Sequence, residues 1–175
     1  FGRDWTSLPL NLDATSADVI LYGECSGDDF GSSVAIVDAN NDGTNDVVIG
    51  ARNAGFRPGG GTTTRRTGGA AYVFLGSTLT QGGRLDLEST TPAWTIYGSK
   101  TGSRLGGSLA TGDFNGDGRK DLAIGSPTED LGSTQQVGAV YLFNGTTGWN
   151  TKATVDLLNG GQTSVAVPAP SIRIT

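Results

Sequence analysis

A nine-residue pattern occurs twice in the chain, 75 residues apart, and it constrains the fold more than any other feature. Both copies read D-x-N-x-D-G-x-x-D, the first from Asp38 to Asp46 and the second from Asp113 to Asp121. Oxygen side chains at positions 1, 3 and 5 of a short loop converge on one point. Glycine at position 6 allows the sharp turn that brings the next backbone carbonyl toward them. This is the geometry of a calcium loop.

Position 12 distinguishes these loops from the helix-flanked kind. An EF-hand places a bidentate glutamate there, whereas this chain has Ile49 and Ile124. The carboxylate stands instead at position 9, as Asp46 and Asp121, directly before apolar runs typical of buried strands. We therefore predict that each loop joins two strands of a β-hairpin. The alternative is that Asp, Asn and Gly only form turns; the recurrence of the whole pattern favours the metal.

Composition favours strands and argues against several functions. The 29 Gly and the absence of Met leave little from which long amphipathic helices form. A net charge of -5 argues against nucleic-acid binding, and two bound divalent cations would bring it to about -1. Cys25 is the only cysteine, predicted to be a small packing residue, and there is no His. Zinc binding and catalysis are therefore not expected, and no apolar run is long enough to span a membrane.

The chain repeats itself beyond the two loops. A shift of 75 residues aligns Tyr22-Gly23 with Tyr97-Gly98 and Phe30-Gly31 with Leu105-Gly106, and a shift of 69 aligns the later part, so six residues are inserted before Ala71. We predict a preceding unit that ends within 1–27 and two repeats at 28–98 and 99–175. The predicted strands are 18–22 in the preceding unit, 33–37, 46–49, 70–75 and 93–97 in the first repeat, and 108–111, 121–124, 139–143 and 171–174 in the second.

Four short antiparallel strands per unit, apolar at nearly every position, predict an all-β fold. We expect propeller blades, two of them full with partial flanking strands. The alternative is a two-sheet sandwich of nine strands. Two blades alone would leave two large apolar faces uncovered. Further blades, from the same or other chains, are therefore expected as partners, and the chain is expected to be a fragment or a protomer that assembles.

These motifs resemble the FG-GAP repeats of integrin alpha subunits and related secreted propellers. The pattern Phe-Gly, calcium loop, Gly-Ala-Pro and Gly-Ala-x-Tyr-x-Phe is followed in both repeats, with Leu105 in place of Phe, Arg52 in place of Pro and Ser126 in place of Ala. The resemblance implies an integrin-alpha-like β-propeller outside the cell, secreted or at the cell surface. It also implies two calcium sites, with ligands from Asp38, Asn40, Asp42, the carbonyl of Thr44 and Asp46, and from Asp113, Asn115, Asp117, the carbonyl of Arg119 and Asp121.

The function expected from these features is a calcium-binding module for adhesion or protein-ligand binding, in which calcium is structural. Its ligand would contact the loops opposite the metal, at 25–29, 51–69, 99–104 and 126–137. One alternative is a lectin-like propeller that binds a glycan, which exposed Trp5 and Trp149 would favour, whereas Trp94 is expected in the core. Another is an accessory domain of a secreted enzyme. Asn144-Gly145-Thr146 matches a glycosylation sequon, relevant only to a secreted eukaryotic protein.

Overall fold

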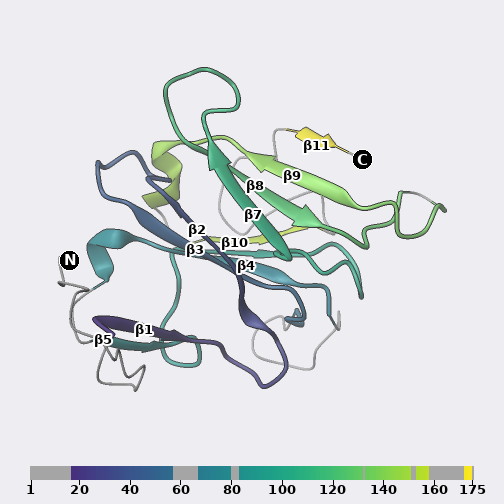
Figure 1. The fold of residues 1–175 in the computed structure, drawn as a ribbon, viewed down its shortest axis with the longest axis horizontal. Coiled ribbons are helices and arrows are strands. Elements are labelled where there is room, and N and C mark those ends of the chain that lie inside the picture. The colour runs from purple at the N-terminus through teal and green to yellow at the C-terminus, as the bar shows by residue number, and fades with distance from the viewer. Residues whose placement is uncertain are drawn as a thin grey trace, which may run out of the picture.

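Three β-sheets stacked face to face make up the computed structural model of the protein (Figure 1). The structure describes residues 17–56, 67–79, 83–131, 133–150, 153–157 and 172–174. Its strands are β1 Val19–Tyr22, β2 Phe30–Val37, β3 Asp46–Ala51, β4 Ala70–Phe74, β5 Gly83–Asp86, β6 Trp94–Tyr97, β7 Ser108–Gly112, β8 Asp121–Ser126, β9 Ala139–Phe143, β10 Ala153–Asp156 and β11 Ile172–Ile174, with short 3-10 turns η2 Gly76–Thr78 and η3 Thr147–Asn150. No described helix is long and apolar enough to cross a membrane.

Each repeat forms one antiparallel sheet, as the sequence predicts. In the first sheet β2, β3, β4 and β6 lie side by side, and in the second sheet β7, β8, β9 and β11 do. The nine predicted strands are all present, displaced by at most a few residues. The all-β fold of antiparallel blades is therefore confirmed, and the two-sheet sandwich is not what forms.

Two strands were not predicted, and both link one sheet to the next. β5 follows β4 of the first repeat but pairs in parallel with β1, and β10 of the second repeat pairs in parallel with β6 of the first. In each case the connection after the third strand of a repeat crosses to the preceding sheet and adds an outer strand to it. Neighbouring repeats are therefore joined by backbone hydrogen bonds as well as by side-chain packing.

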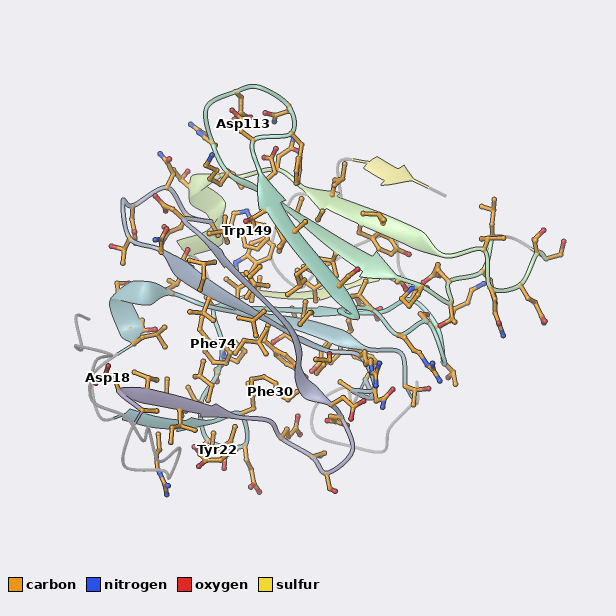
Figure 2. All side chains as sticks on the ribbon, in the orientation of Figure 1. Asp18, Tyr22, Phe30, Phe74, Asp113 and Trp149 are labelled. Carbon is orange, nitrogen blue, oxygen red and sulfur yellow. The ribbon has the colours of Figure 1, made fainter. Side chains whose placement is uncertain are left out.

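The first sheet is buried on both faces, which explains why its strands are apolar at successive positions. Side chains alternate across a strand, so neighbours such as Val48 and Ile49 enter different cores. Val48 packs toward the second sheet, in a cluster with Ile124 and Tyr141. Ile49 packs toward β1 and β5, in a cluster with Tyr72 and Phe74. Figure 2 shows Phe30 and Phe74 pointing into this second layer of core.

Trp149 lies in the core between the two large sheets, not at the surface. Its ring stacks on Trp94 with centroids 4.1 Å apart, and its edge meets Phe143. The indole Nε1 donates a hydrogen bond to the carbonyl of Asn144 at 3.3 Å. Trp94 is in the core as predicted, whereas Trp149 has an exposed fraction of only 1% and cannot stack on a sugar. Trp5 lies outside the described residues.

Removing the Trp149 side chain should destabilise the fold strongly, because η3 then no longer fills the space beside Trp94. We expect Trp149→Ala to lower the free energy of unfolding by about 3–5 kcal/mol, measured by urea denaturation. Val34→Ala is the matched control, since Val34 is 59% exposed, and it should change stability by less than about 0.5 kcal/mol. Equal losses for the two variants would contradict this description of the core.

Candidate metal sites

The two acidic loops lie at the same end of the stacked sheets. The first joins β2 to β3 and the second joins β7 to β8 (Figure 1). Figure 2 marks Asp113 in the second loop, away from the body of the sheets. The loop between β8 and β9 leaves the opposite end. The strand order therefore confirms the sequence prediction that both loops lie at one end of the molecule.

Positions 1 and 5 organise each loop through hydrogen bonds to its own backbone. The Asp38 carboxylate accepts the backbone N–H of Asp42 at 3.0 Å and of Gly43 at 2.9 Å. In the second loop Asp113 accepts the N–H of Asp117 and of Gly118 at the same two distances. Position 5 in turn accepts the N–H of position 7, which is Thr44 in one loop and Arg119 in the other. The turn is formed by the same bonds in both copies.

The amide at position 3 fixes the carboxylate at position 5. Asn40 Nδ2 donates to Asp42 Oδ2 at 2.8 Å, and Asn115 Nδ2 donates to Asp117 Oδ2 at 3.0 Å. This Asn40 bond is the main cause of a lowered pKa of Asp42, while the backbone N–H of Arg119 is the main cause of a lowered pKa of Asp117. The lowered pKa keeps both carboxylates ionised at neutral pH. Both are also exposed to solvent.

Position 9 has a different environment, because it is buried and connects the loop to a distant strand end. Asp46 accepts the N–H of Ala39 and, with its other oxygen, the N–H of Gly76 after β4, both at 2.9 Å. Asp121 accepts the N–H of Phe114 and of Gly145 after β9, both at 2.8 Å. Burial raises the pKa of Asp46. Sequence reasoning missed the two glycine partners, which lie 30 and 24 residues away.

The donor atoms of the loops suit a hard cation, although the carboxylates now face backbone amides. Within the described residues, no three Asp, Glu, His or Cys side chains come close enough together to hold a metal ion. Each loop nevertheless supplies three carboxylates and one amide oxygen on a turn that is already formed. Most of these oxygens accept one hydrogen bond and keep a second lone pair, whereas Asp113 Oδ1 accepts two, from the N–H groups of Gly116 and Asp117. Oxygen ligands of this kind are what calcium takes in proteins, so the residues fit the ion chemically.

Positions 5 and 9 should behave differently in metal-free protein. With EDTA present, Asp121→Ala should lower the free energy of unfolding by about 2–4 kcal/mol, because it leaves the N–H groups of Phe114 and Gly145, the latter buried, without acceptors. Asp117→Ala removes only exposed contacts and should cost less than about 1 kcal/mol. Urea denaturation of both variants in EDTA measures the difference. A loss of the same size for both would show that Asp121 has no separate structural role.

The opposite end of the sheets carries the loops predicted to contact a ligand, as far as they are described. The turn at 25–29 contains Cys25, a free thiol of intermediate exposure. The turn at 99–104 lies against the end of β8 and the loop that follows. Ser126, the last residue of β8, donates a hydrogen bond to the carbonyl of Ser103, and Thr128 of the loop donates one to the carbonyl of Gly102. Within the predicted stretch 51–69, residues 57–66 lie outside the described residues.

Comparison with known proteins gives results that agree with the repeated motifs. The family model described as FG-GAP repeat matches residues 30–74 and 105–143. Mouse phosphatidylinositol-glycan-specific phospholipase D is 36% identical over 143 residues, which are 82% of this chain and 15% of that protein. Integrin alpha-5 of Xenopus laevis is 37% identical over 127 residues, 72% of this chain and 11% of that protein. Mouse integrin alpha-3 is 32% identical over 142 residues, 81% of this chain and 12% of that protein. The chain thus spans less than a fifth of the length of these relatives.

Proposed function

We propose that this chain, which is an FG-GAP repeat protein, acts outside the cell as a calcium-binding β-propeller module for adhesion or for binding a protein ligand. The observation that carries the proposal is the pair of acidic loops with matching backbone hydrogen bonds at one end of the sheets. The role of calcium in it is structural. A weak site of this class stays filled where calcium is abundant, which is the case outside cells.

The side chains of each loop have a defined part in holding the ion. The ligands would be Asp38, Asn40, Asp42, the carbonyl of Thr44 and Asp46 in the first loop, and Asp113, Asn115, Asp117, the carbonyl of Arg119 and Asp121 in the second. The ion, when bound, supplies positive charge that relieves the repulsion among three carboxylates. Asp46 benefits most, because burial alone disfavours its ionised form. Since Asp46 also contacts Gly76, the loop and the end of β4 would be stabilised together.

The contact between the two repeats supports the proposal that further blades are partners. Gly106 of the second repeat inserts against the first sheet, and its carbonyl accepts a 2.7 Å hydrogen bond from Ser33 Oγ. The fit leaves no room for a side chain, because a Cβ built on Gly106 would lie 2.3 Å from the carbonyl oxygen of Ala70. One built on Gly50 would lie 2.0 Å from the Gly106 oxygen. A Leu-Gly turn of one blade therefore occupies a socket on its neighbour.

The equivalent socket on the second sheet is formed by the same residue types. Ser108, Gly125 and Ala139 correspond to Ser33, Gly50 and Ala70, and they line an open groove of about 420 Å³. The neighbouring side chains Val137 and Val140 are 43% and 38% exposed. We infer that this face receives the Phe-Gly or Leu-Gly turn of another FG-GAP blade, which would cover an apolar surface that is costly to expose.

A second function is favoured by the comparisons rather than by the site. Part of a protein named as a phospholipase D is 36% identical to this chain, so an accessory role beside a catalytic domain is the alternative. We expect no catalysis from the chain itself, because its sequence has no His and its one thiol stands without a histidine to activate it. The glycan-binding alternative loses one of its two expected stacking residues with the burial of Trp149.

A thermal melt tests the calcium proposal. A site with a dissociation constant of 0.1–1 mM should stabilise the fold by about 1.4–2.7 kcal/mol in 10 mM calcium, so the melting temperature should rise by several degrees relative to EDTA. Magnesium at the same concentration is the matched control and should give a much smaller rise. The double variant Asp42→Asn, Asp117→Asn should lose the calcium effect. An unchanged melting temperature in calcium would refute the proposed sites.

A further inference from the structure

A polar pocket lies between the two repeats at the end of the sheets opposite the metal loops. Its volume is about 420 Å³, within the usual range of ligand pockets. Thr67 of the first repeat forms one side of it. Residues of the turn at 100–104 and of the described parts of the following loop, 128–131 and 133–136, form the others, with Lys100, Arg104, Asp130 and Gln136 among the lining residues.

The two segments of the second repeat are held together rigidly beneath this pocket. The Thr128 hydroxyl donates to the carbonyl of Gly102, and the Ser126 hydroxyl donates to the carbonyl of Ser103 at 2.9 Å. Glu129 is 1% exposed and accepts a hydrogen bond from the Ser99 hydroxyl, while its other carboxylate oxygen lies 3.1 Å from Ser126 Oγ. A pocket on such a frame is already formed before a ligand arrives, which lowers the entropic cost of binding.

The backbone around the pocket is in an unusual conformation. Three of the five non-glycine residues with positive φ in the described part of the chain line it: Thr67 at 51°, Arg104 at 58° and Gln136 at 53°. Such a conformation costs of order 1 kcal/mol or more, and it is rare for a β-branched residue such as Thr. Arg104 is further fixed by its N–H, which donates to the carbonyl of Thr67 at 3.2 Å.

Comparison of the two repeats shows what is particular to Arg104. The equivalent residue in the first repeat is Asp29, which has the same backbone conformation, with φ of 55°. Its carboxylate accepts hydrogen bonds from Arg52 Nε at 3.0 Å and Asn53 Nδ2 at 2.8 Å. The first repeat therefore closes this position with an internal ion pair.

The second repeat leaves the same position open. The residues equivalent to Arg52 and Asn53 are Pro127 and Thr128, and neither carries a negative charge that could form an ion pair with a guanidinium. Asp130 is the one acid among the described residues that line the pocket, and it lies 3.7 Å from the ammonium of Lys100. No acidic side chain in the described ranges forms an ion pair with Arg104. Among the described residues, the pocket thus presents an arginine fork on a fixed backbone whose side-chain donors form no ion pair.

We propose that this pocket binds a carboxylate side chain, Asp or Glu, from a protein ligand, with Arg104 as the residue that contacts it. The proposal rests on the protein-binding role proposed above and names the chemistry by which a partner is recognised. A guanidinium can bind a carboxylate through two parallel hydrogen bonds. The carboxylate of a uronic-acid glycan is the competing source, but none of the described residues that line the pocket is aromatic and could stack on a sugar ring.

The test uses the whole chain in the presence of calcium and two peptides with acetylated and amidated ends. The peptides differ only in one side chain, which is a carboxylate in one and an amide in the other. The probe is acetyl-Gly-Ser-Asp-Ser-Gly-amide, and its Asn counterpart is the control peptide. Backbone amide shifts are followed by two-dimensional NMR during titration. We expect saturable shifts confined to residues 100–104 and 128–136 with the Asp peptide, and about tenfold weaker binding or none with the Asn peptide.

Two arginine variants separate the site from net charge. Arg104→Gln should weaken binding of the Asp peptide by about 10- to 100-fold. Arg52→Gln removes the same charge at the same end of the molecule and should leave binding unchanged. Both variants should keep the calcium-dependent rise in melting temperature, so failure here is distinguishable from failure of the calcium proposal. Equal binding of the two peptides, an unaffected Arg104→Gln variant, or binding of an oligo-uronate but not of the peptide would each overturn the proposal.

Discussion

The fold depends on the requirement that each β-sheet be covered on both faces. Val48 and Ile49 are neighbours in β3, yet one packs toward the second sheet and the other toward β1 and β5. Burial of apolar area is the main favourable term in folding, and a single blade cannot supply it alone. The stacking of repeats, the crossing strands β5 and β10, and the socket around Gly50 all serve to bring one sheet against the next. The open groove on the second sheet follows from the same requirement.

The stacking also divides the molecule into two ends with different chemistry. At one end, short hairpin loops carry six of the seventeen acidic residues, and a buried aspartate ties each loop to the following strand end. At the other end, the two repeats diverge although their backbones correspond. Asp29 forms an ion pair with Arg52 of the first repeat, whereas no acid of the described residues forms an ion pair with Arg104 in the second. Because the shared backbone fixes the position and the side chains vary there, this second end is where we place recognition of a partner.

Most of the fold could be predicted from the sequence, because both of its signals are local. The strands appear as apolar runs of four to eight residues, and the loop pattern fixes where each hairpin turns. β5 and β10 could not be found this way. Gly83–Asp86 and Ala153–Asp156 contain charged or polar residues and become strands only through parallel pairing with β1 and β6, far away in the chain. The glycine N–H groups that contact Asp46 and Asp121, and the burial of Trp149, likewise depend on long-range contacts.

The central claim is that each of the two loops binds one calcium ion, and counting the ions tests it most directly. Equilibrium dialysis of the intact chain against radioactive calcium, at free concentrations up to 10 mM, gives the number bound per molecule. The account predicts two ions for the unaltered chain and one for a chain in which Asp113 and Asp117 are both replaced by Asn. Binding of no ions, or the same number in both chains, would contradict it.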